Sequence, residues 1–276
     1  MTWQAMQLPH DHAPVASGKI GVLLVNLGTP AAPTPAAVKR YLGEFLSDKR
    51  VVEIPQLLWQ PILRGIILNV RPKKSAHAYQ QVWTPEGSPL AAITYRQAAA
   101  LAERLGHGVE VDWAMRYGEP SIPRQLQALM DRGCERILLA PLYPQYCGAT
   151  TATVVDKAGE ALKAMRWQPS LRVLPPYHDD PVHIAALAQD IGGQLDALDF
   201  VPEVLLLSFH GMPQRTLELG DPYHCQCLKT ARLLAAALAR PDMRIRPTFQ
   251  SRFGRAKWLE PATDRSEEHT SELQSH

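Results

Sequence analysis

Short apolar runs rich in Val, Ile and Leu alternate with longer amphipathic segments along most of this chain. This alternation is typical of a parallel sheet that is covered by helices on both faces, so the fold class that we predict is α/β. With 276 residues, of which 46% are hydrophobic, the chain is long enough for two domains or for one large α/β unit. We expect strands at six places: 20–26, 109–115, 136–142, 171–174, 204–208 and 245–249.

Proline and glycine mark the expected ends of several helices. Thr34, Ser88 and Asp221 are each followed by a proline, and a capping side chain before proline is typical of the first turn of a helix. Gly106 and Gly133 lie where a helix would need a left-handed residue at its carboxyl end.

A weak internal repeat indicates that the chain has two similar halves. VLLVNLGTP matches LLLSFHGMP, which aligns Gly28 with Gly211, and MRYGEPSI resembles SRFGRAKWL further along each half. The repeat predicts α/β halves at 19–178 and 179–263, with a long insertion at about 41–90 in the first. Ligands of open parallel sheets bind beyond the carboxyl ends of the strands, so we expect a cleft between the halves.

Both ends of the chain are expected to lie outside these halves. Residues 1–18 lack the basic patch and the continuous apolar core of a signal peptide, and we interpret them as a disordered leader. Residues 264–276, DRSEEHTSELQSH, contain Leu273 as the single large apolar residue and have no periodicity. We predict that they are a non-native tail, in which case the second half lacks at least one strand.

Charge and cysteine content exclude some classes of function. The net charge of +2 gives no field that would favour nucleic acid as a partner. Neither GxxxxGK[ST] nor GxGxxG occurs, which disfavours nucleotide binding. Four irregularly spaced cysteines without an export signal indicate reduced thiols in a cytoplasmic protein.

His210 ends the apolar run of the second half, at the position that Leu27 holds in the first. A histidine at the end of a strand is more often a hydrogen-bonded structural residue than a catalytic one. The neighbouring Ser208 and Gly211 favour a functional role, because they hold the ring at the expected cleft with little room to relax.

Other candidate residues follow the expected strands of the first half. Arg116 could bind a carboxylate and Tyr117 could stack on a flat ligand, although a capping arginine and a packed tyrosine explain the spacing equally well. Tyr143 and Tyr146 follow another strand, and repeated aromatic residues at one edge are consistent with an apolar slot for a planar ligand.

Ser88 is most simply an N-cap and Trp258 a core residue, but both could line the cleft. His224, Cys225 and Cys227 form a compact cluster in an expected first helical turn. CxC is poorer zinc geometry than CxxC and no second ligand pair follows, so we do not predict a metal site there. The apolar segment 57–70 is interrupted by proline and arginine; it cannot span a bilayer but could lie on one.

The chain resembles the ferrochelatases, and most closely those of Gram-negative bacteria. The resemblance rests on GVLLVNLGTP, EGSPL, RYGEPSI, LYPQY, LSFHGMPQRTLELGDPYHCQC and TFQSRFGRAKWLEP, which occur in the family's order from Lys19 to about Thr263. It implies two Rossmann-like halves that grip a porphyrin, and insertion of Fe(II) into protoporphyrin IX to form protohaem, the last step of haem biosynthesis.

The resemblance also implies roles for individual residues. His210 would remove pyrrole protons or hold the incoming Fe2+, and imidazole suits both tasks because it is neutral near pH 7 and binds borderline metals. The positions that would line the porphyrin pocket are Leu27, Ser88, Arg116, Tyr117, Tyr143 and Trp258. The insertion would form an apolar lip over the pocket, which suits peripheral contact of segment 57–70 with the inner membrane.

Two departures from the family pattern shape these expectations. The glutamate that the family places opposite the histidine belongs to a carboxyl-terminal block that this chain lacks, so the catalytic pair is expected to be incomplete. The cysteine that anchors a [2Fe-2S] cluster in some relatives would fall at Gly148, and we expect no cluster and no other cofactor. A porphyrin-binding or haem-binding protein of the same fold without turnover remains the alternative function.

Overall fold

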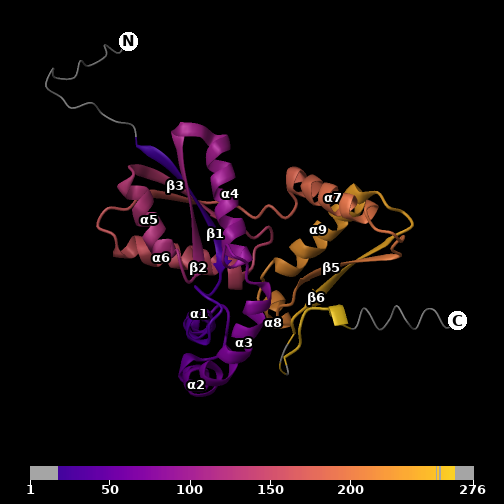
Figure 1. Cartoon of the computed structure of the whole chain (residues 1–276), viewed down its shortest axis with the longest axis horizontal. Coiled ribbons are helices and arrows are strands. Elements are labelled where there is room, and N and C mark those ends of the chain that lie inside the picture. The colour runs from indigo at the N-terminus through magenta and orange to yellow at the C-terminus, as the bar shows by residue number, and fades with distance from the viewer. Residues whose placement is uncertain (1–17, 253, 255, 265–276) are drawn as a thin grey trace, which may run out of the picture.

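A computed structural model describes residues 18–252, 254 and 256–264, and divides their strands between two parallel sheets (Figure 1). All but one residue of the predicted leader and of the predicted tail lie outside these described residues. All six predicted strands are confirmed: β1 (Lys19–Gly28), β2 (Val109–Tyr117), β3 (Cys134–Pro141), β4 (Ser170–Val173), β5 (Val204–His210) and β6 (Arg244–Gln250).

The first sheet has the order β2-β1-β3-β4, and its inner strand β1 is buried on both faces. Leu23 and Val25 of β1 pack under α5 (Ile122–Asp131) and α6 (Thr153–Ala164), whereas Val22 and Leu24 face α4 (Pro89–Leu105). Burial on both faces requires a continuous apolar strand rather than an alternating one, which explains the sequence of β1.

Four helical segments form a lobe at one end of the first sheet (Figure 1). They are α1 (Pro35–Ser47), α2 (Gln56–Ile62), the π-helical turn η1 (Leu63–Ile67) and α3 (Leu68–Val82). Val38, Leu42 and Leu63 are buried in a core of their own, which Tyr117 joins from the end of β2. We call this lobe the lip; it contains most of the predicted insertion.

The second sheet has two strands, β5 and β6, which pair in parallel. Helix α7 (Pro181–Asp196) packs on α9 (Tyr223–Leu238), and α9 packs on β6. Cys227, Phe249 and Leu259 are buried between them, and the short helix α8 (Gln214–Glu218) follows β5. The residues of β5 stay partly exposed, in contrast to those of β1.

Helices begin close to the three predicted starts, but the capping residue or its hydrogen bond differs at two of them. The Thr34 hydroxyl accepts from the Ala37 backbone N–H at 3.4 Å, as a capping residue should. Ser88 occupies the N-cap of α4, but its side chain makes no capping hydrogen bond. For Asp221 and Pro222 the prediction is corrected by one residue: Pro222 is the N-cap of α9, and the Asp221 carboxylate accepts from the Tyr223 N–H at 3.0 Å.

Close backbone approach explains why the repeat aligns Gly28 with Gly211. A Cβ at Gly28 would lie 2.0 Å from the carbonyl oxygen of Tyr117, and a Cβ at Gly211 would lie 2.5 Å from that of Gln250. Gly28 ends β1 and Gly211 directly follows β5, each at a point where the neighbouring strand leaves no room for a side chain. Gly28 also has φ +119, which L side chains rarely adopt.

Candidate functional site

The carboxyl ends of the strands carry most of the predicted site residues. Leu27 lies at the end of β1, Arg116 and Tyr117 end β2, and Tyr143 follows β3. His210 is the last residue of β5 in the other sheet. In Figure 1 the strands of both sheets end toward the region where the lip and α8 lie.

His210 is exposed, and no described residue forms a hydrogen bond with its imidazole. The backbone is fixed: the His210 carbonyl accepts from the Tyr223 hydroxyl at 3.1 Å, and His210 pairs with Gln250 of β6. Partial removal from water lowers the pKa of His210 below its ordinary value, because desolvation disfavours the charged ring. The lowered pKa favours the neutral imidazole at pH 7, with lone-pair density available to a proton or a metal.

Trp258 lies beside the loop that leaves His210. It forms an isolated bridge with Pro213, and its Cε3 would lie 3.4 Å from a Cβ at Gly211. The flanking backbone is held as well, because the Leu259 N–H donates to the Met212 carbonyl at 2.9 Å. The structure thus brings Trp258 and His210 to the same end of the second sheet.

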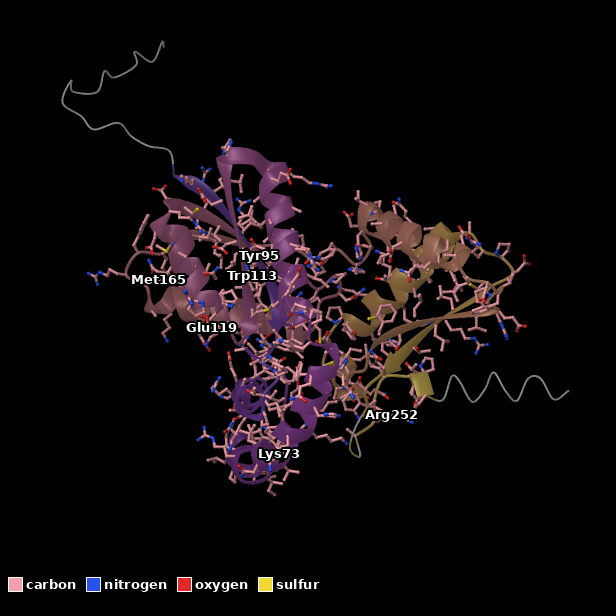
Figure 2. All side chains as sticks on the ribbon, in the orientation of Figure 1. Lys73, Tyr95, Trp113, Glu119, Met165 and Arg252 are labelled. Carbon is pink, nitrogen blue, oxygen red and sulfur yellow. The ribbon has the colours of Figure 1, made fainter. Side chains whose placement is uncertain are left out.

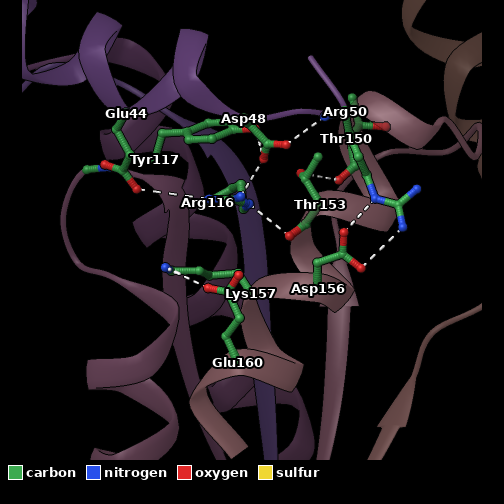
Figure 3. Close-up of polar contacts among 11 residues, drawn as sticks. Glu44, Asp48, Arg50, Arg116, Tyr117, Thr150, Thr153, Asp156, Lys157 and Glu160 are labelled. Atoms are coloured by element: carbon green, nitrogen blue, oxygen red, sulfur yellow. Dashed lines mark hydrogen bonds and ion pairs between the residues drawn. The ribbon is translucent and has the colours of Figure 1, made fainter. Parts of the chain in front are cut away.

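Arg116 and Tyr117 are both engaged in a buried polar network (Figure 3). The Arg116 guanidinium donates to the Asp48 carboxylate at 2.5 Å and to the Thr153 carbonyl at 2.8 Å, and the Tyr117 hydroxyl donates to the same Asp48 oxygen at 2.9 Å. The Phe45 ring meets the Tyr117 ring edge-on at 5.0 Å. Tyr117 therefore makes the contacts of a packed tyrosine, the structural alternative that the sequence left open. Arg116 is held by the Asp48 carboxylate and the Thr153 carbonyl, and not as the capping residue of that alternative.

Leu27 and Tyr143 form apolar surroundings at the same edge. Leu27 packs against the core of the lip, and Tyr143 packs against the main core of the first sheet. The Tyr143 hydroxyl is buried without a hydrogen-bond partner among the described residues, and burial raises its pKa. A buried hydroxyl without a partner carries a desolvation cost that a bound polar group would relieve.

Ser88 is buried at the start of α4. The same helix contacts β1 through Thr94, whose hydroxyl accepts from the Asn26 side-chain amide at 3.1 Å, one residue before Leu27. In the described part of the chain, the Ser88 side chain forms no hydrogen bond with the other predicted site residues, so its place in the site remains a prediction.

The His224, Cys225 and Cys227 cluster does not converge on a point. The His224 ring stacks on Phe249 at 5.4 Å, Cys225 is exposed and Cys227 is buried. In the described part of the chain, no three His, Cys, Asp or Glu side chains are grouped so that they could hold a metal ion. His210 accordingly has no second and third ligand there.

Asp48 is the residue that sequence analysis missed. It stands directly after α1, where an acidic residue looks like an ordinary solvated helix end. Its partners Arg116 and Tyr117 lie 68 and 69 residues further along the chain, so no local pattern could reveal the contact. The one available signal was that a partly buried arginine at a strand end needs a carboxylate nearby.

Known proteins resemble this chain over most of its length. The ferrochelatase family model matches residues 19–275. The chain is 57% identical to the ferrochelatase of Rhizobium meliloti over 92% of this chain and 76% of that protein. It is 52% identical to the ferrochelatase of Agrobacterium fabrum, over 97% of this chain and 79% of that protein.

A solved structure shares the fold at much lower identity. SirB from Bacillus subtilis with Fe3+ aligns with a TM-score of 0.52 and 15% identity, over 92% of this chain and 71% of that one. This likeness concerns the fold alone, and it agrees with the α/β class predicted from the alternating apolar runs. On the family model and the curated relatives together, the chain belongs to the ferrochelatases, metal chelatases of haem biosynthesis that insert Fe(II) into protoporphyrin IX.

Proposed function

We propose that this chain inserts Fe(II) into protoporphyrin IX and that His210 is its catalytic residue. The observation that carries the proposal is the state of the His210 ring: exposed at a strand end, without a described partner and with a lowered pKa. A ring that is already hydrogen-bonded or protonated would have to be released before it could act. This imidazole is available at pH 7 without such a step.

The chemistry of metal insertion uses both properties of a neutral imidazole. Two pyrrole N–H protons leave the macrocycle as the divalent ion enters, so a base near the ring nitrogens lowers the barrier. Imidazole nitrogen also ligates Fe(II), a metal of intermediate softness. His210 can serve as the base or as the residue that delivers the ion, and either role requires its unprotonated form.

Leu27, Tyr143 and Trp258 are proposed to contact the porphyrin, because a flat macrocycle binds best to apolar and aromatic surfaces. Ser88 is proposed to line the same site near its edge. Arg116 and Tyr117 are proposed to shape the wall of the site from their fixed positions. Asp48 engages the Tyr117 hydroxyl and Nη2 of Arg116, and the Thr153 carbonyl engages Nε of Arg116.

A spectroscopic experiment tests the role of His210. Protoporphyrin is added to the chain and its Soret band is followed before and after addition of Fe(II), or of Zn(II) as a redox-stable substitute. We expect His210→Ala to bind porphyrin nearly as well as the unaltered chain, and to lose about 100-fold or more in the rate of metallation.

His183 offers the matched control, because its ring lies in α7 against Tyr177, at 5.2 Å, outside the proposed site. His183→Ala should metallate at the unaltered rate. Metallation that is unchanged in His210→Ala would contradict the catalytic role. Porphyrin binding by the unaltered chain without any metallation would instead support the alternative function, a porphyrin-binding protein of this fold.

The proposed enzyme works without a [2Fe-2S] cluster. Gly148 stands where some relatives carry a cluster cysteine, and it offers no ligand. Burial raises the pKa of the neighbouring Cys147 thiol to about 12, and that of Cys227 to about 12, so both remain protonated at pH 7. Iron and acid-labile sulfide in the purified protein would contradict this proposal.

We also propose that the lip touches a membrane surface from the outside. Leu57, Leu58 and Val70 are 91%, 65% and 71% exposed. The exposed basic residues Arg71 and Lys73 belong to α3 of the same lobe, where Figure 2 labels Lys73. Exposed apolar side chains together with basic ones are typical of helices that lie in a bilayer interface. None of the helices built from described residues is long and apolar enough to cross a bilayer.

Vesicle sedimentation tests the contact. The chain should sediment with vesicles that contain anionic lipid, and the double variant Leu57→Asp, Leu58→Asp should bind several-fold more weakly. Val201 is the matched control, because it is also 91% exposed but lies between α7 and β5. An equal loss of binding in Val201→Asp would show that general surface apolarity, and not the lip, carries the attraction.

A further inference from the structure

The loop between α1 and α2 contacts both β2 of the first sheet and α8, the helix that follows β5. Asp48 begins this loop as the C-cap of α1, and its own backbone N–H still donates to the Phe45 carbonyl at 3.4 Å. The carboxylate turns away from the lip toward the end of β2 (Figure 3). Asp48 therefore stands where the lip and the first sheet meet.

The two oxygens of the Asp48 carboxylate accept hydrogen bonds from different parts of the structure. Oδ2 accepts from the Arg116 guanidinium at 2.5 Å and from the Tyr117 hydroxyl at 2.9 Å. Oδ1 accepts from the Arg50 backbone N–H at 2.8 Å and so shapes the loop. One side chain thus fixes two residues of β2 and the first turn of its own loop.

Burial makes the Asp48–Arg116 pair different from the other ion pairs of this region. The two side chains are 12% and 10% exposed, whereas those of the nearby Arg50–Asp156 pair are 46% and 48% exposed. The next carboxylate to Arg116 is that of Glu44, at 3.9 Å. Without Asp48, the buried guanidinium would keep one distant counterion and the Thr153 carbonyl.

The far end of the same loop reaches the second half of the molecule. The Glu53 carboxylate accepts from the Arg215 guanidinium at 2.6 Å, and Arg215 belongs to α8, which begins four residues after His210. The segment from Asp48 to Glu53 therefore spans from the edge that holds Tyr117 to the helix that follows His210.

We propose that Asp48 is a positioning residue for porphyrin binding: it locks Arg116 and Tyr117 into the wall of the site and anchors the loop that joins this wall to α8. This inference rests on the proposed function, because it assigns to Asp48 the geometry of the porphyrin site. Asp48 does not touch the substrate; it acts through the side chains that it holds.

Asp48→Asn is the informative change, because the amide keeps the shape and one acceptor but loses the charge that holds Arg116. We expect the Kd for protoporphyrin to rise about tenfold and the Soret band of the bound porphyrin to move toward that of the free one. Once porphyrin saturates the site, the rate of metallation should change less than twofold, because His210 is untouched. The effect should therefore fall on KM and not on kcat.

Asp156→Asn is the matched control, since it removes the same charge from the exposed outer pair of the same network. Its Kd should equal that of the unaltered chain. Tyr117→Phe removes one hydrogen bond to Asp48 and keeps the buried ion pair, and it should raise Kd two- to threefold even if Asp48→Asn fails to fold.

The outcomes separate this inference from the proposed function. A lower melting temperature of Asp48→Asn with unchanged Kd and unchanged Soret position would overturn the positioning role and leave Asp48 as a stabilising residue only. Equal Kd values for Asp48→Asn and Asp156→Asn would overturn it as well. If the unaltered chain bound no porphyrin at all, the proposed function itself would fail.

Discussion

The carboxyl edges of the two sheets differ in how their polar groups are satisfied. At the first edge, Tyr117 is buried, the Arg116 side chain is only 10% exposed, and both donate to Asp48. At the second edge, His210 is exposed, and its ring has no hydrogen-bond partner among the described residues. The polar groups of the first edge are bound to one another and hold a fixed shape, whereas the second edge keeps a titratable group available. This division suits a reaction that needs a rigid surface for a flat substrate and a free base beside it.

The largest loss of folding stability should come from removing Asp48 at the first edge, and removing His210 at the second edge provides the comparison. Asp48→Ala leaves Arg116 buried without its close counterion, and we expect the free energy of unfolding to fall by about 3 kcal/mol. His210→Ala removes an exposed ring, and its stability should stay within about 0.5 kcal/mol of the unaltered chain. Urea denaturation measures both. Equal losses would show that the two edges do not differ as described.

Substitution of the two glycines of the repeat should have a somewhat smaller effect on stability, and it compares the two sheets a second time. Gly28→Ala places a Cβ 2.0 Å from the Tyr117 carbonyl at a φ of +119 and should cost about 2–3 kcal/mol. Gly211→Ala meets the Gln250 carbonyl at 2.5 Å, in a sheet of two strands that has more freedom to shift, and should cost about 1–2 kcal/mol. A reversed order of the two melting temperatures would mean that the second sheet is the more rigid one.

Acid should weaken the second half before the first. The pKa values of His178, His183 and His210 are all lowered, mainly by desolvation, and these histidines lie in or next to the second half. Below the ordinary histidine pKa of about 6.5, the unfolded chain binds more protons than the folded one, so stability falls as the pH drops from 7 and levels off below the folded values.

Hydrogen exchange at pH 7 and pH 5 checks this expectation. The amides of α9 and β6 should lose protection at pH 5 relative to those of β1 and β3. His178→Gln should reduce the loss, because the neutral amide cannot be protonated in this range. Equal loss of protection in both sheets would contradict the assignment to these histidines.

The smallest effect is expected for the ion pair that connects the lip with α8. The side chains of Glu53 and Arg215 are 44% and 64% exposed, so the pair should contribute about 0.5 kcal/mol, and less at high salt. Glu53→Gln, Arg215→Gln and the double variant form a cycle that isolates this value. A coupling above about 2 kcal/mol would show that the lip is held to α8 much more firmly than an exposed pair allows.

Much of the fold could be predicted because its signals are local. The apolar runs identified all six strands, and Thr34 identified the start of α1. The boundary at Pro222 was wrong by one residue, because Asp221 reaches past the proline to the Tyr223 N–H. The strand ends in turn predicted which side chains reach the carboxyl edges, since parallel strands bring those ends together.

The sequence by itself determined the alternation of strands and helices, the equivalence of Gly28 and Gly211, and the delivery of His210 to a strand end. These follow from apolar periodicity and from the steric needs of a single residue type. Only the tertiary structure decided that Arg116 and Tyr117 are held by Asp48 while His210 is left without a described partner. No local sequence pattern indicates that a carboxylate and a guanidinium 68 residues apart will pair. Only the folded backbone brings them within hydrogen-bond distance.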